Sequence, residues 1–373
     1  MNQPAGGQGG GEAAALARID AVRARRPRLN DAVVTLAHGA GGKASAALVD
    51  AVFIEAFGQP CPDELTDAAL LDVGSGGQIA LTTDSYVVNP RRFPGGSIGH
   101  LAVNGTVNDL AVSGARPAWL SAAFVIEEGM EVAELKQIAA DMRQAASQAG
   151  VAIVTGDTKV VPKGAADGCF ITTAGVGIVP PGRRLGAKQV ICGDAMVVSG
   201  PLGSHGMAVM MARGNLALEA DIRSDCAPVN HQVEALLAAV PDVRWMRDAT
   251  RGGLATVANE LARASGLGVM LDDAALPVIP AVRGACDMLG IDPLYVANEG
   301  VFVAVVPAQD AQTAVEAIAS VPAPPNHPAD AALSPAVIGH LTSQAPGLVG
   351  VQNAFGGTRL VDMLVGDPLP RIC

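Results

Sequence analysis

Aromatic residues are scarce in this sequence: its 373 residues include 7 Phe, 2 Trp and 2 Tyr. The core must therefore be aliphatic, and little is available to stack on single-stranded bases. Basic residues are also outnumbered, with 25 Lys and Arg against 36 Asp and Glu and a net charge of −11. A general nucleic-acid binder needs a basic face, so this balance argues against that class. No apolar run approaches the length of a membrane-spanning helix, so no membrane span is expected.

Cysteine is sparse as well. The six cysteines are far apart and form no CxxC pair, which is typical of reduced thiols in a cytoplasmic protein. The first 31 residues lack an early basic cluster followed by an apolar core, so they do not read as a secretory signal. They contain the short basic run Arg23–Arg28, and we interpret them as a flexible, solvated leader.

Glycine, by contrast, is abundant: 44 residues, or about 12 %, against a typical share of about 7 %. The length suggests two domains, and Pro180–Gly182 marks a boundary between them. Neighbouring strands and intervening helices predict two α+β domains with mixed sheets. The expected strands are 33–36, 79–81, 118–126, 151–155, 169–179, 194–199 and 301–306. The expected helices are one bearing Leu48–Phe53, then 98–114, 131–150, 206–213, 254–264 and 311–320.

A glycine-rich turn, His38–Lys43, lies between the first expected strand and helix. Glycines there let backbone N–H groups approach an anion, and Lys43 can pair with a phosphate. The turn is not a Walker A loop, and it matches a dinucleotide-binding loop only loosely. A flexible surface loop is the alternative interpretation.

Three acids follow or interrupt expected elements: Asp84 and Asp157 at strand ends, and Asp109 within the helix 98–114. Strand ends converge at one edge of a sheet, where carboxylates can share a cation such as Mg²⁺. Any one of these acids can instead be a turn or cap residue. Asn104 and Asn108 share a face of the same helix, where they either bond structurally or contact a nucleotide.

The second half has two comparable stretches. Asp248 precedes a glycine-bearing turn that starts a helix, where it can be a metal ligand or an N-cap. Glu299 precedes a strand and can be a base or a cap. His38 and His205 lie in glycine-rich turns, where a histidine is more often a structural donor than a catalyst. The tail Gly366–Cys373 has two prolines that keep it extended, and it resembles a swinging arm that ends in a thiol.

Taken together, these stretches resemble one family, the HypE hydrogenase maturation proteins, from about residue 33 to residue 373. The motifs are LAHGAGGK (36–43), LTTDSYVVNP (81–90), FPGGSIGHLAVNGTVNDLAVSGA (93–115), GDTKVV (156–161), MRDATRGGL (246–254), DPLYVANEG (292–300) and LPRIC (369–373). This resemblance implies the two-domain α+β, PurM-like fold of aminoimidazole ribonucleotide synthetase, with mixed sheets and an extended C-terminal tail. The implied parts are a leader (1–31), an ATP-binding domain (32–180), a second α+β domain (181–362) and a mobile tail (363–373).

The resemblance also implies a reaction. A HypF-type carbamoyltransferase loads a carbamoyl group onto Cys373, and the protein dehydrates it to a thiocyanate with ATP and Mg²⁺. The cyanide then passes to a HypC–HypD complex that builds the iron ligands of [NiFe]-hydrogenase. The family forms homodimers. Two other hypotheses are an enzyme of the same superfamily that acts on a free small molecule, and a non-catalytic thiol carrier or scaffold.

The resemblance and the spacing together suggest roles for individual residues. The expected metal ligands are Asp84, Asp109 and Asp157, and the catalytic residues are Cys373 with either His38 or Glu299 as the base. The expected nucleotide-binding residues are Gly41, Gly42, Lys43, Thr83, Asn104, Asn108, Lys159 and Asp248.

Four positions depart from the family pattern. Ser97 and Ser204 stand where the family usually has Asp, so we expect neither to be an essential ligand. Arg91 and Arg92 replace a more apolar stretch.

Overall fold

The computed structural model describes residues 29, 31–39, 42–57, 66–74, 76–214, 220–322, 335–364 and 371–373. Most of the expected leader, Gly41 and residues 365–370 of the expected tail therefore lie outside the described residues. The chain divides into two compact units, residues 1–60 with 365–367, and residues 61–364 with 368–373. Each is described by itself.

The first unit contains short helical segments only, within its described residues. They are the 3₁₀ helix η1 (Leu36–Gly39), α2 (Lys43–Leu48), the π-helical η2 (Val49–Ile54) and α3 (Glu55–Phe57). The helix expected around Leu48–Phe53 is confirmed. The strand expected at 33–36 is wrong, because Val33 and Val34 are exposed and find no sheet to pair with. A β-branched run favours a strand only where a neighbouring strand can take up its hydrogen bonds.

The second unit begins with a five-stranded sheet in the order β1-β2-β7-β5-β6. Its strands are β1 (Ala69–Asp72), β2 (Gln78–Tyr86), β5 (Arg116–Glu127), β6 (Ala152–Val161) and β7 (Cys169–Val179). All neighbours are antiparallel except β5 and β6, which are parallel. The sheet is thus mixed, as predicted. A two-stranded ribbon, β3 (Arg92–Phe93) with β4 (Gly96–Ser97), leads into the first long helix.

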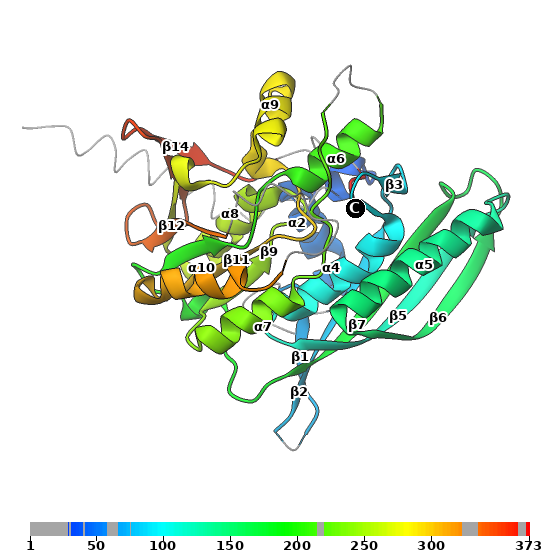
Figure 1. The fold of residues 1–373 in the computed structure, drawn as a ribbon, viewed down its shortest axis with the longest axis horizontal. Coiled ribbons are helices and arrows are strands. Elements are labelled where there is room, and N and C mark those ends of the chain that lie inside the picture. The colour runs from blue at the N-terminus through cyan, green and yellow to red at the C-terminus, as the bar shows by residue number, and fades with distance from the viewer. Residues whose placement is uncertain are drawn as a thin grey trace, which may run out of the picture. The chain divides into compact units, whose positions relative to one another are not determined.

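Two helices, α4 (Ile98–Val112) and α5 (Val132–Ala149), pack against each other beside this sheet (Figure 1). Helix α4 contacts β2, β5 and β7 directly and is buried almost all round. Its small residues permit this close approach: a Cβ at Gly105 would overlap the hydroxyl of Tyr86. We call the face that packs on α4 the inner face of the sheet and the opposite face the outer face.

The other sheet has seven strands in the order β14-β13-β10-β12-β8-β11-β9. They are β8 (Ala195–Val198), β9 (Trp245–Asp248), β10 (Gly268–Asp272), β11 (Phe302–Val306), β12 (Ala336–Thr342), β13 (Val349–Gln352) and β14 (Thr358–Val361). Only β10 and β13 are parallel among the neighbouring pairs, so this sheet is mixed too. Strand β11 is buried along its whole length, as its run of aliphatic residues requires.

The helices of this half are α6 (Ser204–Ala212), α7 (Asn230–Ala239), α8 (Gly253–Ser265), α9 (Pro280–Leu289) and α10 (Ala311–Ala319). Short 3₁₀ turns join them: η3 (Ala187–Gln189), η4 (Asp273–Ala275), η5 (Pro293–Tyr295) and η6 (Ala308–Asp310). The predicted helices α6, α8 and α10 are confirmed, whereas α7 and α9 were not expected. Among the described residues, no helix is long and apolar enough to cross a membrane.

Candidate active site

Three carboxylates from separate elements meet in the second unit. Asp67 precedes β1, Asp109 lies in α4 and Asp248 ends β9. Each offers an oxygen, and these oxygens all lie within 4.8 Å of one another. Thr82 Oγ1 donates to Asp109 Oδ2 over 2.8 Å, and Arg247 Nε lies 2.7 Å from Asp67 Oδ1. The structure therefore brings together two residues singled out from the sequence and one that was not.

The electrostatics of this cluster suit a cation. Burial raises the pKa of Asp109 and of Asp248 well above the usual range, and neighbouring carboxylates raise both further. Hard oxygen ligands held this close repel one another unless a positive ion lies between them. The three carboxylates thus have the chemistry of a Mg²⁺ site.

Asp84 and Glu299 carry the acidic character beyond these three residues. Tyr86 donates its hydroxyl to Asp84 Oδ2 over 3.2 Å. Burial raises the pKa of Glu299 well above its usual range, and the charges of Asp248 and Asp84 add to this effect. Arg251 opposes it. The guanidinium of Arg251 is thus a second positive charge near these acids, in addition to Arg247 at Asp67.

Glu299 is held through its backbone by another buried acid, Asp225. The Asp225 carboxylate accepts from the N–H groups of Glu299 and Gly300, each at 3.0 Å, through the same Oδ2 atom. Burial raises the pKa of Asp225 to about 6 in spite of these bonds. A Cβ at Gly300 would overlap the carbonyl oxygen of Asp225, so the two segments can approach this closely only with glycine there.

The two asparagines of α4 differ in their use. Asn108 donates to the carbonyls of Ala227 and Glu299 at 3.1 and 3.2 Å and accepts from Val229 N–H at 2.8 Å. All of these bonds join its amide to segments of the second domain. Of the two alternatives for Asn108, structural bonding therefore fits better than contact with a nucleotide. Asn104 donates to Cys226 Sγ, but its buried Oδ1 has no partner. Only Asn104 keeps an acceptor atom for a ligand.

Asp248 owes its position to the turn that follows it. Gly252 and Gly253 adopt φ of +77° and +58°, which a residue with a side chain rarely does. A Cβ at Gly253 would also meet the carbonyl oxygens of Leu294 and Val296 at 2.5 and 2.6 Å. The glycine pair thus starts α8 immediately beside η5, and it brings Arg251 to the acids.

The last three residues of the sequence dock on this unit. Val87 N–H donates to the Cys373 carbonyl at 3.1 Å and Asn89 N–H donates to the Arg371 carbonyl at 3.3 Å, the spacing of an antiparallel pair. Ile372 is buried, 4 % exposed, and joins the apolar core. The pKa of Arg251 is raised chiefly by the charge of Cys373, and next by Asp84 and Glu299. The thiol-bearing residue therefore lies beside the acidic group.

His205 holds this stretch from the other side. Its Nε2 lies 2.6 Å from the Ile372 carbonyl oxygen, which can only accept, so Nε2 carries the proton. Nδ1 must then accept from the Ser224 hydroxyl, 2.8 Å away. Burial lowers the pKa of His205 to about 4, which keeps the ring neutral. The prediction that His205 is a structural donor is confirmed.

Thr83, Asp157 and Lys159 are not part of this arrangement. Thr173 pairs with Asp84 on one side and with Ala122 on the other, and Ala122 pairs with Gly156. Directly paired residues share a face, so Gly156 lies on the inner face with Asp84, whereas Thr83 and Asp157 lie on the outer face. The predicted convergence of Asp84 and Asp157 at strand ends is therefore wrong within one chain. Strands β2 and β6 continue past both acids, and alternation separates them.

On the outer face, Asp157 pairs with Lys159 at 2.6 Å, and both side chains are about two-thirds exposed. Lys159 is the main reason that the pKa of Asp157 is lowered. In a single chain the Asp157–Lys159 pair is exposed to solvent and the pKa of its acid is lowered, whereas Asp109 and Asp248 are buried and their pKa values are raised.

The residues predicted from the glycine turn belong to the first unit. Gly42 is the N-cap of α2 and Lys43 is its first residue. Thr35 N–H donates to His38 Nδ1 at 3.0 Å, and His38 Nε2 lies 3.4 Å from Asp31 Oδ2. Their predicted roles toward a nucleotide stay predictions, as does that of Gly41, which lies outside the described residues.

The structure explains three of the four departures from the family pattern. Ser97 donates to Asp141 Oδ2 at 2.7 Å, so this serine joins a hydrogen-bond network that Arg92 completes at 2.8 Å. Arg91 pairs with Glu134 of α5 through Nε at 2.9 Å and Nη2 at 3.3 Å. Both arginines thus tie the ribbon β3–β4 to α5. Nothing in the structure explains Ser204, whose buried hydroxyl has no partner.

Several residues of the site were missed from the sequence. Asp67 precedes an exposed strand and carries no motif of its own. Asp225 and Ser224 lie in a stretch without regular structure, so no periodicity points to them. Their only sequence signal is polar residues among Cys226, Ala227 and a proline.

Comparison with known families divides the chain as the sheets do. Residues 65–179 match the AIR synthase related protein, N-terminal domain, and residues 192–325 match the corresponding C-terminal domain. These matches cover the five-stranded sheet, strands β8 to β11 of the seven-stranded sheet, and every acid of the acidic group.

Individual relatives are closer still. A carbamoyl dehydratase HypE of Rhodobacter capsulatus is 51 % identical over 348 residues, which are 92 % of this chain and 99 % of the relative. A solved HypE–HypF complex is similar with a TM-score of 0.78 at 43 % identity, over 85 % of this chain and 100 % of the other. A solved HypE in complex with ATP is similar with a TM-score of 0.74 at 42 % identity, over 91 % of this chain and 100 % of the other.

Proposed function

The chain belongs to the HypE family of carbamoyl dehydratases, and from this premise we propose that it dehydrates a carbamoyl group carried on its own Cys373. The S-carboxamide loses its oxygen and both amide protons and becomes an S-cyanate. ATP takes up the elements of water as ADP and phosphate, so the reaction balances. The cyanide serves as a ligand of the iron in [NiFe]-hydrogenase.

One observation carries this proposal: the residues that end in Cys373 bond through their backbone to Val87 and Asn89, directly after the strand that holds Asp84. The charge of Cys373 also acts on Arg251, as do those of Asp84 and Glu299. A group attached to the Cys373 sulfur is thereby delivered to the acidic group of the fold. Neither a free small-molecule substrate nor a passive carrier requires a seat of this kind for the end of the chain.

We infer that ATP is the phosphoryl donor, in keeping with the relative that was solved with ATP. Asp67, Asp109 and Asp248 would hold Mg²⁺, with Asp84 beside them. When bound, the ion neutralises phosphate charge. Asn104, with its unpartnered Oδ1, is the amide we assign to ligand contact. Phosphate contacts from Gly42 and Lys43 remain part of the proposal.

For the base we favour Glu299 over His38. Glu299 and Cys373 act on the same guanidinium, so the carboxylate and the amide nitrogen belong to one neighbourhood. A buried carboxylate with a raised pKa is a stronger base once ionised than one in water. Asp225, through the backbone of Glu299, aims that carboxylate.

The carbamoyl group would come from a HypF-type carbamoyltransferase, the partner in the solved complex of a relative. The cyanide would pass to a HypC–HypD complex, which is the acceptor that the family resemblance implies. Both steps require Cys373 to be reached by a second protein.

We also propose a homodimer through the outer face of the five-stranded sheet. This face exposes large apolar side chains that a monomer ordinarily buries. They are Leu81, Trp119, Val125 and Ile178, which the strand pairing places on the same face as Thr83. A second copy would cover them and enclose Thr83, Asp157 and Lys159.

The test is mass spectrometry of the peptide that ends in Cys373. After incubation with a HypF-type carbamoyltransferase and carbamoyl phosphate, Cys373 should carry a carbamoyl adduct that loses one water only when ATP is added. Cys373→Ser should show neither change, whereas Cys192→Ser, at an exposed cysteine of the second domain, should behave as the parent.

An unmodified Cys373 would contradict the proposal. An adduct that persists although ATP binds would favour the carrier hypothesis instead.

A further inference from the structure

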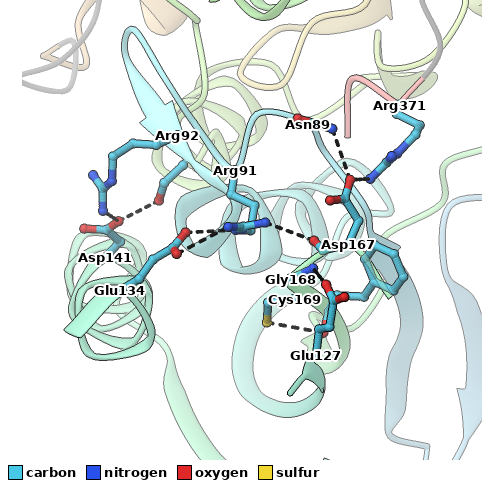
Figure 2. Close-up of polar contacts among 12 residues, drawn as sticks. Asn89, Arg91, Arg92, Glu127, Glu134, Asp141, Asp167, Gly168, Cys169 and Arg371 are labelled. Atoms are coloured by element: carbon cyan, nitrogen blue, oxygen red, sulfur yellow. Dashed lines mark hydrogen bonds and ion pairs between the residues drawn. The ribbon is translucent and has the colours of Figure 1, made fainter. Parts of the chain in front are cut away.

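The loop between β6 and β7 holds the side chain of Arg371. Asp167, near the end of this loop, accepts from Arg371 Nη2 at 2.7 Å through Oδ2. The same oxygen accepts from Asn89 Nδ2 at 3.0 Å, as Figure 2 shows. One carboxylate thus links the last residues of the chain to the segment on which they dock.

Asp167 is held in place by residues that do not touch Arg371. The carboxylate of Glu127 accepts from the Gly168 N–H, as Figure 2 shows, and also from the Gly164 N–H, so it bridges both ends of the loop's turn. Arg91 Nη1 donates to the Asp167 carbonyl at 3.0 Å while its other nitrogens pair with Glu134. The loop is therefore anchored to β5 and to α5, and Asp167 does not depend on the tail for its position.

Arg371 Nε also donates to the Val87 carbonyl at 3.2 Å, and the remaining polar contacts described for the last three residues involve their backbone. The carbonyl of Arg371 accepts from Asn89 N–H and from Arg213 Nη2, at 3.3 and 2.8 Å. The carbonyls of Ile372 and Cys373 accept from His205 and from Val87 N–H. Backbone bonds of this kind repeat along an extended strand, so they do not distinguish one register from another two residues away.

Side chains must therefore choose the register. Ile372 fills an apolar position, and Pro370, two places away, is also apolar. Arg371 is different, because it is the one basic residue of the stretch Gly366–Cys373 and it meets a carboxylate that is already in place.

We propose that Asp167 is a positioning residue that sets the register of the tail, so that Cys373 and no other residue lies beside Arg251. This inference rests on the proposed function, since it concerns how the substrate-bearing residue is presented. Asp167 does not touch the reacting atoms. It acts through Arg371, across a pair whose side chains are 33 % (Arg371) and 46 % (Asp167) exposed.

The first experiment measures seating of the tail without any reaction. The Cys373 thiol is alkylated with iodoacetamide, and its rate is followed by peptide mass spectrometry relative to exposed Cys192 in the same molecule. Asp167→Asn should raise the relative rate about two- to fivefold, the range expected for a partly exposed ion pair. Asp287→Asn, at an exposed carboxylate on α9, is the matched control and should leave the rate unchanged.

Double substitution separates a specific pair from general loosening. Arg371→Gln should raise the alkylation rate at least as much as Asp167→Asn, and the double variant should add nothing to Arg371→Gln. Asp167→Glu, which keeps the charge, should restore part of the protection. If the effects of Asp167→Asn and Arg371→Gln on the alkylation rate multiply in the double variant, the proposal is wrong. It is also wrong if Asp167→Asn is alkylated at the rate of the parent.

The second experiment uses protein already carbamoylated on Cys373. At saturating ATP, Asp167→Asn should lower the dehydration rate by a factor close to that of its alkylation effect, with an unchanged KM for ATP. If alkylation responds as expected but neither protein dehydrates the adduct, the proposed function fails while the seating role of Asp167 stands. If dehydration keeps the parent rate although alkylation is faster, Asp167 does not position the reacting residue.

Discussion

The two faces of the five-stranded sheet carry acids of opposite character. On the inner face, Asp84 lies beside Asp109 of α4, and burial raises the pKa of both. On the outer face, Asp157 is exposed and Lys159 holds its pKa below the usual range. Neighbours in sequence, such as Thr83 and Asp84, are separated by one step of strand alternation.

This difference shows what a carboxylate needs in order to be a ligand here. The inner acids are kept close by α4 and β9 although they repel one another, so their arrangement costs stability until a cation arrives. The outer acid is already neutralised by its lysine and pays no such cost in a single chain. The following predictions test that contrast.

The largest expected effect is on the inner face. Asp109→Asn should lower the rate of ATP-dependent dehydration about 100- to 1,000-fold, because a cation loses one of its charged ligands. The melting temperature without metal should stay the same or rise, since one of the mutually repelling carboxylates is gone. Thermal unfolding with and without Mg²⁺ should show that the increase in melting temperature with the ion is lost. An activity near that of the parent would exclude Asp109 as a ligand.

On the outer face, a charge should prevent association. Val125→Arg places a cation on this face, at a valine that is 37 % exposed in the single chain. Two copies would bring these charges together, so we expect dimer affinity to fall at least about tenfold, measured by light scattering across a dilution series. Val132→Arg, at a valine 66 % exposed at the start of α5, is the matched control. A parent that is already monomeric would remove the dimer from the proposal.

Asp157→Asn should have a smaller effect than Asp109→Asn. We expect dehydration to slow by less than about tenfold, because this acid does not belong to the cluster within one chain. The increase in melting temperature on adding Mg²⁺ should be retained. If that increase disappears, the outer face contributes a ligand through the second copy, and the contrast between the faces disappears with it.

The smallest effect concerns pH. The pKa of Asp109 is raised from 3.8, so the folded protein binds its proton more tightly, and the associated stability is lost as the pH rises above about 4. In metal-free protein, Asp109→Asn should therefore gain stability relative to the parent between pH 5 and 8. The pKa of Asp157 is lowered from 3.8, so its contribution is present above that pH and lost below it. Urea unfolding of Asp157→Asn should thus differ from the parent by a constant amount from pH 5 to 8.

Strong local patterns predicted much of the fold. Strand β7 has the predicted bounds, Cys169–Val179. Helix α4 begins at the predicted residue and ends two residues early, and α5 is one residue shorter than predicted at each end. Both helices have recognisable end signals in the sequence: α5, for example, ends at Gly150, which adopts the left-handed conformation. The strands β9, β10, β13 and β14 escaped prediction, because four or five residues are too few for a period to be recognised. Strand β12 has seven residues, but an irregularity between Val337 and Gly339 interrupts its alternation.

For the site, residue types were easier to predict than their grouping. Asp84, Asp109, Asp248 and Glu299 belong to one neighbourhood, but strand lengths decided that Asp157 does not. Asp67, Asp225 and Asp167 act through contacts across long stretches of chain, which no spacing in the sequence encodes. At Val33–Leu36 the error is the opposite one: the residues favour a strand locally, but no neighbouring strand in the described part of the chain pairs with them, and the predicted strand does not form.

The seat for Arg371–Cys373 has a kinetic consequence, since substrate and enzyme are one chain. The local concentration of a tethered segment is typically millimolar and does not change on dilution. The rate per molecule should then be the same at nanomolar and micromolar protein, and the substrate has no Michaelis constant. A free peptide of the same sequence would compete only near millimolar concentration. Evolution can tune turnover of such an enzyme through the fraction of time spent seated, rather than through affinity in the usual sense.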